Sequence, residues 1–407
     1  MASKVLDMIN KEANRQYNNI ELIASENFVS DEILYAVGSI LTNKYAEGYP
    51  DVEDTAGQRG RYYGGCQYVD EIEDYCRKMW QKAFNTDYHV NVQPHSGANA
   101  NFASYLAVLK PGDTVLSMSL ENGGHLSHGL KANVSGKLYN FVHYDVDENG
   151  LIDYDDLAKK IDRWRPQLII AGASAYPRQI DFQKIYDIIQ EVKKEYEDSY
   201  NPYFMVDMAH IAGLIVAGDH PSPFGLADII TTTTHKTLRG PRGGLIFCKP
   251  ELAKKIDSAV FPGLQGGPLE HVIAGKAICA EEACTQEYKD YIHQVVKNCK
   301  AMADRFTELG YDVITGGTDN HLFLLDFSSK FPTITGLAVQ NKLDEFGITL
   351  NKNTVPNEKR SPKITSGVRI GTAAMTTKGW KESDFIWCAD QIDYIIKKMA
   401  EEDKEMV

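Results

Sequence analysis

The sequence predicts an α/β fold: a large domain built on a mostly parallel seven-stranded sheet, followed by a smaller C-terminal α+β domain. Seven short runs of β-branched or apolar residues indicate the strands of the large domain. Polar stretches with helical spacing separate most of these runs, and strands that alternate with helices are typical of a parallel sheet covered by helices on both faces. After about residue 270 this alternation ends, which indicates the second domain.

The large domain is expected to begin with a helix, a strand, a turn and a second helix. Residues 67–84 carry apolar side chains at helical spacing, VNVQ at 90–93 predicts a strand, and a helix follows the turn PHSGANAN. The later strand runs are DTVLSM, YNFVHY, QLIIAGAS, YFMVD, DIITTTT and GGLIFC. Polar helical stretches such as DYDDLAKKIDRW and FQKIYDIIQEVKKEYE lie between them.

The smaller domain is expected to begin with a long helical segment over residues 273–310. DVITGG, HLFLLDF, a further helix and VRIG follow, and this order indicates an α+β domain. We therefore expect an N-terminal arm over 1–45, a large domain over 46–270 and a small domain over 271–407. The Pro/Gly-rich stretch FPGLQGGP at 261–268 is the expected junction, although such a loop could equally reach into a neighbouring subunit.

Charge and composition exclude several classes of function. The 407 residues include 43 Lys and Arg against 56 Asp and Glu, a formal charge of -13, so the average surface repels nucleic acid and anionic lipid. The seven cysteines are scattered without CxxC pairs, which is typical of reduced thiols. The N-terminus lacks the apolar stretch of a signal peptide, and no apolar run reaches the roughly 18 to 20 residues of a membrane span. We expect a cytoplasmic protein.

Two charged residues follow strand runs, where α/β sheets bind ligands. Asp207 ends YFMVD, and a carboxylate there could pair with a protonated pyridine nitrogen. Lys236 follows DIITTTTH, where burial and the positive neighbours Arg239 and Arg242 could favour imine chemistry. Taken singly, Asp207 could instead cap the next helix and Lys236 could be an exposed surface charge.

Small residues indicate a phosphate site at the turn HSGANAN. Ser96, Gly97 and Ala98 lie between a strand and a helix, so that backbone amides, the helix N-terminus and the Ser96 hydroxyl could face a phosphate. An ordinary tight turn is the alternative. The pair Gly266 and Gly267 in QGGP is equally open to both interpretations.

Three histidines mark the same loops: His125 in ENGGHLSH, His210 in VDMAH, and His235 beside Lys236. A flat imidazole could stack on a pyridine ring and help to exclude water, although a structural role is open for each. A zinc site at His125 and His128 lacks a third ligand, so we expect no metal.

Two further groups could serve a substrate. Arg369 in SGVRIGT suits capture of an amino-acid carboxylate through two hydrogen bonds, with a surface ion pair as the alternative. Tyr45, Glu47 and Tyr63 lie among glycines in NKYAEGYP and RYYGG, where aromatic clusters more often serve packing.

Together these motifs resemble the serine hydroxymethyltransferase family of fold-type-I pyridoxal phosphate enzymes, and the resemblance runs across nearly the whole chain. The similar segments include ELIASEN, LTNKYAEGYP, RYYGGCQYVD, NVQPHSGANAN, GGHLSHG, SAYPR, VDMAHIAGL, TTTTHKTLRGPRGG, FPGLQGGP, GGTDNHLFL, NKNTVPN and SGVRIGT.

The resemblance implies roles for residues around pyridoxal phosphate. Lys236 would form the imine, Asp207 would pair with the ring nitrogen and His125 would stack on the ring. Ser174 and His210 would contact the phenolic oxygen, with His235 beside Lys236. The phosphate contacts would come from Ser96, Gly97 and Ala98, and from the partner subunit's Gly266 and Gly267. Tyr45 would also contact the cofactor.

The resemblance also implies a substrate site shared between two subunits of a homodimer or tetramer. Arg369 and Ser25 would bind the amino-acid carboxylate. Tyr45 and Glu47 would enter from the partner chain, which the N-terminal arm would contact. Tyr63 would contact the substrate, and Glu47 would bind the substrate and handle a proton near the serine hydroxyl. The implied catalytic residues are Lys236, Glu47, His125, His235 and Tyr63. The implied folate contacts are Leu120, Leu126, Asn353 and Glu47.

The implied reaction transfers the hydroxymethyl carbon of serine to tetrahydrofolate, giving glycine and 5,10-methylenetetrahydrofolate. This chain departs from common members of the family in the segment DVEDTAGQRG after Pro50, at Ala98 in the phosphate turn and at Asn122 before GGH. A folate-independent aldolase acting on threonine-like or α-methyl β-hydroxy amino acids is therefore an alternative. A non-catalytic binding protein on the same fold is a remote one.

Overall fold

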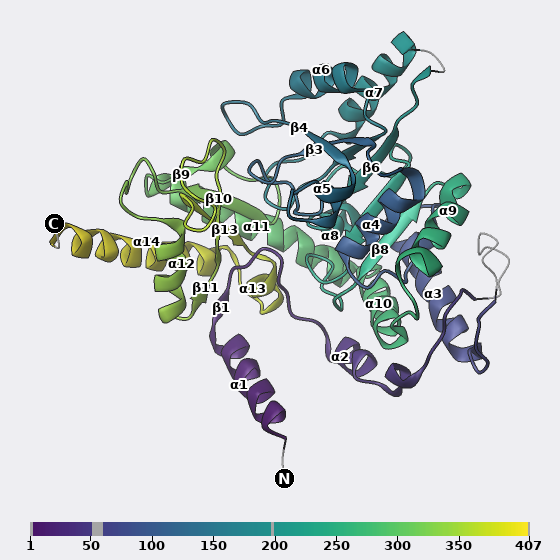
Figure 1. Cartoon of the computed structure of the whole chain (residues 1–407). Coiled ribbons are helices and arrows are strands. Elements are labelled where there is room, and N and C mark those ends of the chain that lie inside the picture. The colour runs from purple at the N-terminus through teal and green to yellow at the C-terminus, as the bar shows by residue number, and fades with distance from the viewer. Residues whose placement is uncertain (1–2, 51–59, 197–198, 406–407) are drawn as a thin grey trace. The chain divides into compact units, whose positions relative to one another are not determined.

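The chain folds into two compact units. The computed structural model describes residues 3–50, 60–196 and 199–405 (Figure 1). The large unit comprises Val29–His293, and the small unit comprises Met1–Phe28 together with Gln294–Val407. The FPGLQGGP stretch lies inside the large unit, and the chain passes from one unit to the other at residues 293 and 294. The domain limits expected after residues 45 and 270 stay a prediction. The contact of the expected N-terminal arm with a partner chain also stays a prediction.

The large unit contains a seven-stranded sheet with the order β2-β8-β7-β6-β5-β3-β4. Its strands are β2 (His89–Asn91), β3 (Thr114–Met118), β4 (Asn140–Tyr144), β5 (Leu168–Ala171), β6 (Tyr203–Asp207), β7 (Ile229–Thr233) and β8 (Gly244–Cys248). Strands β7, β6, β5, β3 and β4 pair in parallel, whereas β8 runs antiparallel to both β2 and β7. The predicted mostly parallel seven-stranded sheet is confirmed.

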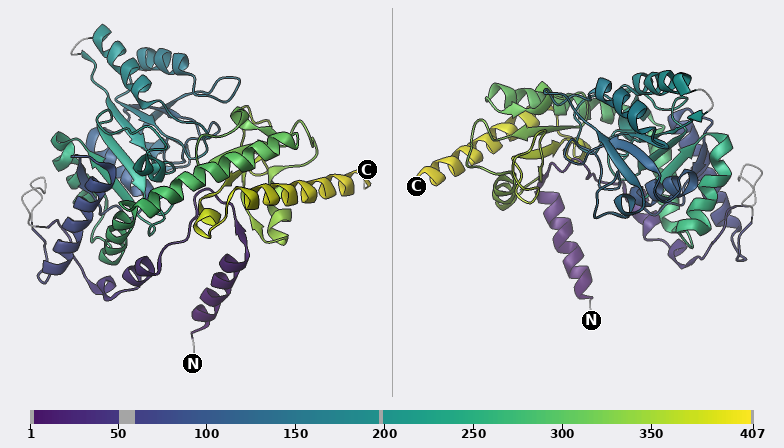
Figure 2. Two further views of the ribbon diagram at one scale, coloured as in Figure 1. Left: turned by 180° about the vertical axis from the view of Figure 1, so that it is seen from behind. Right: turned by 45° about the horizontal axis from the view of Figure 1, so that its top comes forward.

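Helices lie on both faces of this sheet (Figures 1 and 2). Those of the large unit are α2 (Asp31–Val37), α3 (Gln67–Phe84), α4 (Gly97–Val108), α5 (Val134–Leu138), α6 (Tyr154–Trp164), α7 (Phe182–Tyr196), α8 (Ala212–Ala217), α9 (Ala253–Ser258) and α10 (Glu270–Ala283). Every residue of β5, β7 and β8 is buried, as expected for strands covered on both faces. Helix α3 has the bounds that the apolar spacing predicted.

The helical segment expected over residues 273–310 is two helices rather than one. Helix α10 ends at Ala283, and α11 (Gln286–Glu308) starts again after Thr285. The hydroxyl of Thr285 accepts a hydrogen bond from the backbone N–H of Tyr288 at 3.1 Å. A threonine in this position caps a new helix, because its oxygen satisfies an amide that has no partner within the first turn.

The small unit is an α+β unit, as predicted. Its antiparallel sheet has the order β12-β13-β10-β9. The elements of this unit, apart from α11, are α1 (Lys4–Asn18), β1 (Ile20–Glu21), β9 (Asp312–Val313), β10 (Leu322–Asp326), α12 (Gly336–Glu345), β11 (Ile348–Thr349), β12 (Asn351–Asn353), β13 (Gly367–Gly371), α13 (Ala373–Thr377) and α14 (Glu382–Glu405). The core beneath the sheet includes Phe306, Phe323 and Phe385.

One edge of the large sheet is arranged for a ligand. Because β2 and β7 both run antiparallel to β8, β2 is parallel to β7 and to the strands beyond it. The carboxyl ends of these six strands therefore share one edge, and in α/β sheets the loops at that edge bind ligands. Among the described residues, no helix has the length and apolar character that a bilayer span requires.

Candidate active site

The loops at the carboxyl edge carry most of the residues predicted for the cofactor, and two of those predicted for the folate. These are Ser96, Gly97 and Ala98 after β2, Leu120, His125 and Leu126 after β3, Ser174 after β5, Asp207 and His210 at and after β6, and His235 and Lys236 after β7. The strand order sets β6 and β7 side by side. Asp207 and Lys236 thus reach the edge from neighbouring strands.

Lys236 is buried, with 9% of its surface exposed, so the alternative of an exposed surface charge is wrong. The next residue fixes the loop: Thr237 Oγ1 donates a hydrogen bond to the His210 carbonyl at 2.9 Å and accepts one from the Gly213 N–H at 3.1 Å. These two bonds tie the loop after β7 to the loop after β6, and so hold Lys236 and His210 on one side of the sheet edge.

Asp207 is a buried carboxylate with three hydrogen-bond donors. Its Oδ2 accepts from Asn101 Nδ2 at 2.9 Å and from His128 Nε2 at 3.0 Å, and its Oδ1 accepts from the backbone N–H of Ala209 at 3.1 Å. Burial alone would raise the pKa of Asp207, but the hydrogen bonds from the histidine and the asparagine outweigh it and hold the pKa below its usual value. An ionised carboxylate suits a protonated pyridine nitrogen.

The alternative of a helix cap at Asp207 is wrong as well. Helix α8 begins at Ala212, and the residue at its N-terminus, Ile211, makes no side-chain capping bond. Asp207 Oδ1 instead accepts a hydrogen bond from the Ala209 N–H within a short turn, while Oδ2 accepts from Asn101 and His128.

The turn expected to bind phosphate forms the N-terminus of α4. Ser96 Oγ accepts a hydrogen bond from the Asn99 N–H at 3.2 Å and donates one to Asn99 Oδ1 at 2.8 Å, so this hydroxyl already caps the helix. A Cβ atom at Gly97 would lie 2.6 Å from Thr233 Cγ2, which explains the glycine. The first-turn amides have no partner inside a helix, and so Gly97 and Ala98 offer backbone donors to a phosphate.

Three cations surround this part of the edge although the chain carries a net charge of -13. Partial burial and then the charges of Lys236, Arg242 and Lys276 lower the pKa of the half-buried His235 to about 3. Lys276 is 1% exposed, and burial lowers its pKa to about 8. Its Nζ donates to the carbonyls of Val92 at 2.7 Å, Gly244 at 2.9 Å and Pro94 at 3.0 Å, directly before the turn at Ser96.

These observations fit pyridoxal phosphate. The helix N-terminus and the cations offer positive charge and amide donors to a phosphate, and Asp207 offers an ionised carboxylate to a ring nitrogen. The buried Nδ1 of His235 has no hydrogen-bond partner among the described residues, so it is available to a ligand. The donor set therefore matches a molecule with an anionic end and a basic aromatic nitrogen.

Asn101 and His128 are the site residues that sequence reasoning missed. The sequence indicated His128 only as a zinc ligand, yet its Nε2 is directed to Asp207 Oδ2, and no group of three potential metal ligands occurs among the described residues. His125 Nδ1 lies 2.7 Å from Ser127 Oγ, and the His125 and His128 rings meet edge to face at 5.8 Å. The available signal was position: Asn101 ends the phosphate motif, and His128 ends GGHLSH.

Tyr45, Glu47, Tyr63, Gly266 and Gly267 form a second group, also in the large unit. The Tyr63 hydroxyl donates to Glu47 Oε2 at 3.3 Å, the two tyrosine rings lie 5.2 Å apart, and the charge of Glu47 raises the pKa of Tyr63. A Cβ atom at Gly266 would lie 3.1 Å from Glu47 Oε1, and one at Gly267 would lie 3.4 Å from the Tyr45 ring. Tyr45 is 56% exposed, so packing alone does not account for this group.

Gln265 connects the second group to the phosphate turn. Its Oε1 accepts hydrogen bonds from the His95 N–H at 3.0 Å and from Asn99 Nδ2 at 3.1 Å, and its Nε2 donates to the Gln93 carbonyl at 2.9 Å. Because Gly266 is the next residue, these bonds fix the start of the glycine pair relative to the turn.

Arg61 fastens the chain around the segment DVEDTAGQRG, of which residues 51–59 lie outside the described residues. Gly48 and Arg61 form an antiparallel bridge, and the Arg61 guanidinium donates to the carbonyls of Ala46 and Gly48 at 2.8 and 2.9 Å. The same side chain, 3% exposed, pairs with Glu73 and Asp70, each at 2.8 Å. This clamp, formed by the Arg61 guanidinium with Ala46, Gly48, Asp70 and Glu73, holds the segment that carries Glu47.

The remaining predicted residues form a third group in the small unit. Arg369 lies on β13, its Nε donates to Asn351 Oδ1 at 3.2 Å, and burial lowers its pKa to about 10. A Cβ atom at Gly371 would lie 2.3 Å from Ala24 Cα, so the segment that carries Ser25 runs against the end of the same strand. Asn353 ends the neighbouring strand β12.

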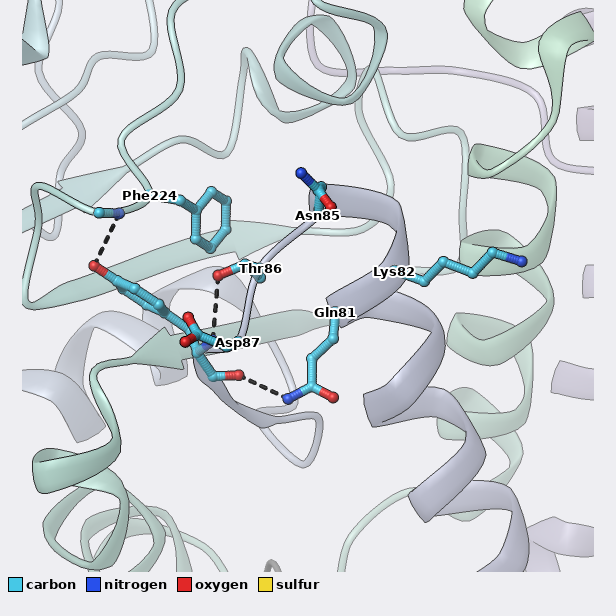
Figure 3. A pocket seen from close by; sticks show the side chains of 8 residues that line it. Gln81, Lys82, Asn85, Thr86, Asp87 and Phe224 are labelled. Carbon is cyan, nitrogen blue, oxygen red and sulfur yellow. Dashed lines mark hydrogen bonds between the residues drawn. The ribbon is translucent and has the colours of Figure 1, made fainter.

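A pocket of about 680 Å³ lies elsewhere (Figure 3). It is lined by Gln81, Lys82, Asn85, Thr86, Asp87, Tyr88, Phe224 and Gly225. Tyr88 directly precedes β2, and Gly225 lies shortly before β7, so this pocket faces the amino ends of the parallel strands. No predicted site residue lines it, and ligands of α/β sheets bind at the opposite edge.

Glu270, beside the clamp, should make stability fall as pH rises. Its side chain is 1% exposed and its oxygens lack hydrogen-bond partners among the described residues, although Oε1 lies 3.7 Å from Arg61 Nη2. Burial followed by the charge of Glu73 outweighs the charge of Arg61 and raises the pKa of Glu270 from 4.5 to about 9. Between these values the folded protein holds a proton that the unfolded chain has released. The stability from that proton is therefore complete below 4.5 and is lost as pH rises through about 9.

Glu270→Gln should remove this dependence and stabilise the protein increasingly above neutral pH. The slope that disappears is at most about 1.4 kcal/mol per pH unit, and urea unfolding from about pH 6 to about pH 8 measures it. Glu281→Gln, in the same helix but exposed, is the control and should leave the slope unchanged. Equal slopes for wild type and Glu270→Gln would show that Glu270 is ionised in the folded protein.

A model of the family described as serine hydroxymethyltransferase matches residues 1–392 of the 407-residue chain.

Proposed function

The chain belongs to the serine hydroxymethyltransferase family, which makes it a pyridoxal-phosphate-dependent enzyme, and from this we propose that it transfers the hydroxymethyl carbon of serine to tetrahydrofolate. The products are glycine and 5,10-methylenetetrahydrofolate. The observation that carries the proposal is the convergence of a buried lysine, a buried carboxylate and an amide-rich helix N-terminus at one sheet edge.

The residues at the carboxyl edge would hold the cofactor. Lys236 would bind it covalently, Asp207 would face its ring nitrogen, and His125 would lie against its ring. The other contacts would come from Ser96, Gly97, Ala98, Ser174, His210 and His235, with Tyr45 and the partner subunit's Gly266 and Gly267. When bound, pyridoxal phosphate supplies an electron sink that lets a bond at the Cα of an amino acid break.

Arg369 and Ser25 would bind the carboxylate of the amino acid. A guanidinium can hold both carboxylate oxygens at once, which fixes the rotation of the substrate about the bond to Cα. Support comes from the burial that lowers the pKa of Arg369 to about 10, because a cation that has lost solvation gains most from an anionic ligand.

Glu47 would handle the proton of the substrate hydroxyl. The Tyr63 hydroxyl donates to Oε2 of Glu47, which leaves Oε1 as the oxygen that would accept the proton. Tyr45 packs edge to face on Tyr63 and helps to orient it. A carboxylate can act as a general base when it lies within hydrogen-bond reach of the reacting hydroxyl.

Exposed apolar side chains support two proposals, a folate site and a contact with a partner subunit. Leu120 and Leu126, in the loop that also carries His125, are 46% and 42% exposed, and with Asn353 and Glu47 they would contact the folate. Helix α1 has no buried residue, and Val5, Leu6, Met8 and Ile9 on it are more than half exposed. An apolar helix face of this kind suits the arm of a homodimer or tetramer. The cytoplasmic location stays a prediction.

The experiment is to incubate the purified protein with serine and pyridoxal phosphate, with and without tetrahydrofolate, and to measure glycine and methylenetetrahydrofolate. We expect both products only when folate is present. Leu120→Ser together with Leu126→Ser should raise the KM for tetrahydrofolate and leave the KM for serine unchanged, whereas Leu106→Ser, equally exposed on α4, should alter neither.

Two other results would contradict the proposal. Equal cleavage of β-hydroxy amino acids with and without folate would identify the folate-independent aldolase. No product under any condition, although the cofactor binds, would indicate a binding protein that keeps the fold.

A further inference from the structure

Asn101, the last residue of the phosphate motif, connects two strands and one loop at the carboxyl edge. Its side chain is 1% exposed. The Nδ2 group donates to Asp207 Oδ2 at 2.9 Å and to Ser127 Oγ at 2.8 Å, and Oδ1 accepts a hydrogen bond from Thr231 Oγ1 at 2.6 Å. The amide orientation follows from its partners, because an ionised carboxylate only accepts hydrogen bonds. One side chain on α4 therefore contacts β6, β7 and the loop after β3.

The bond from Asn101 to Ser127 determines which nitrogen of His125 carries the ring proton. Ser127 Oγ accepts from Asn101, so its own proton is directed to His125 Nδ1, 2.7 Å away. The backbone N–H of Ser127 also donates to Nδ1, at 3.2 Å. With two donors directed at Nδ1, the ring proton belongs on Nε2.

His128 closes the ring of hydrogen bonds. The backbone N–H of His125 donates to His128 Nδ1 at 3.3 Å, so His128 carries its proton on Nε2 and donates it to Asp207 Oδ2 at 3.0 Å. The closed ring consists of Asp207, Asn101, Ser127, His125 and His128. Each hydrogen bond in the ring determines which atom of the next side chain donates and which accepts. Such networks hold a single geometry when every donor and acceptor in them has a partner.

We propose that Asn101 is a positioning residue that orients the Asp207 carboxylate and keeps the ring proton of His125 on Nε2. The inference rests on the proposed function in one respect, that Asp207 and His125 face the cofactor ring. Asn101 lies four residues after Gly97 on the same helix, a rise of ~6 Å. Helix α4 thus sets the distance between the phosphate turn at its first residues and the carboxylate that would meet the ring nitrogen.

Removal of the Asn101 side chain leaves its three partners buried without it. Thr231 is fully buried and Asp207 is 9% exposed, so water cannot simply replace the amide. A hydrogen bond to a charged group is worth roughly a 10- to 100-fold change in an equilibrium constant. We therefore expect Asn101→Ala to weaken the binding of pyridoxal phosphate by about that factor.

The first measurement is made on the cofactor-free protein labelled with ¹⁵N-histidine. Long-range ¹H–¹⁵N correlations report which nitrogen of each imidazole is protonated, and the His125→Gln variant identifies the signal of His125. Wild type should show the Nε2–H tautomer of His125 alone. Asn101→Ala and Ser127→Ala should each show a measurable fraction of the Nδ1–H tautomer, because both release or remove the side-chain donor and leave Nδ1 with the longer bond from the backbone N–H of residue 127.

Asn298→Ala is the matched control. Asn298 is fully buried in the small unit, its Nδ2 donates to Thr376 Oγ1 and to the Trp380 carbonyl, and its Oδ1 accepts from Gln294. Asn298→Ala thus also removes a buried asparagine that makes three side-chain hydrogen bonds. The variant should leave both the His125 tautomer and the affinity for pyridoxal phosphate unchanged. Ser127→Ala serves as the test should Asn101→Ala fail to fold.

The outcomes separate the two proposals. A wild-type affinity for pyridoxal phosphate in Asn101→Ala, or a pure Nε2–H tautomer in both Asn101→Ala and Ser127→Ala, would overturn the role of Asn101. If the wild-type protein itself binds no pyridoxal phosphate, the proposed function fails, while the tautomer measurement still decides whether Asn101 controls His125.

Discussion

Lys236→Ala is expected to abolish the absorbance band that pyridoxal phosphate should acquire in the wild-type protein. It should also lower turnover by about 10²- to 10⁴-fold, the range typical of losing one catalytic side chain, because the variant cannot hold the cofactor covalently. The band would arise from the proposed covalent bond between Lys236 Nζ and the cofactor aldehyde, and borohydride should then remove it from the wild type. Lys236 is the lysine placed for this bond, because it is buried at the carboxyl edge beside β6 and β7.

Two further variants separate the covalent role of Lys236 from its charge. Lys236→Arg keeps a cation near the phosphate turn but cannot form the bond, so it should retain affinity for pyridoxal phosphate and still lack the band. Lys249→Ala removes a half-buried lysine that pairs with Asp228 at 2.7 Å in the same unit, and it should keep the band. A borohydride-sensitive band in Lys236→Ala would assign the covalent bond to another residue.

Asp207→Asn should give the second large effect, a loss of roughly 10²- to 10⁴-fold in kcat/KM, because breaking one member of a buried charge pair costs about 3–5 kcal/mol. The amide cannot replace the carboxylate in any rotamer. Asn101 and His128 donate to Oδ2 while Ala209 donates to Oδ1, so the new NH₂ group faces a donor on either side.

Asp228→Asn is the control for the loss of a carboxylate in the same sheet. Asp228 Oδ2 accepts from the Phe204 N–H at 2.8 Å and Oδ1 pairs with Lys249, at the amino end of the strands. It should lower stability without a selective loss of affinity for pyridoxal phosphate. If Asp207→Asn and Asp228→Asn reduce kcat/KM equally, Asp207 has no special role at the ring nitrogen.

The sequence predicted the fold and the edge of the site because these depend on local patterns. The apolar spacing of residues 67–84 gave α3 with its observed bounds, and Asp207 and Lys236 followed strand runs that proved to be β6 and β7. Alternation of strands and helices already implies that such residues meet at one edge. The end of α10 before Thr285 was not predicted. A threonine inside an apolar pattern caps a new helix only when a backbone N–H of the following turn donates to its hydroxyl, as Tyr288 does here.

The hydrogen-bond network could not be predicted, because its members are far apart in the chain. Asn101 reaches Asp207, 106 residues away, and Thr231, 130 residues away. His128 was weighed as a metal ligand because spacing shows which residues are near in sequence, not which carboxylate a ring will face after folding. The roles given to Ser25, Glu47, Arg369 and Asn353 stay predictions.

The clamp at Arg61 makes the position of Glu47 independent of the length of the neighbouring chain segment. The bridge from Gly48 to Arg61 and the buried guanidinium of Arg61 hold the chain on both sides of the segment between Pro50 and Gly60. Glu47 lies next to this bridge. Substitution or extension within residues 51–59 should leave the Glu47–Tyr63 pair in place. The position of Glu47 therefore depends on the contacts of Arg61 and not on the length of the chain that the bridge closes.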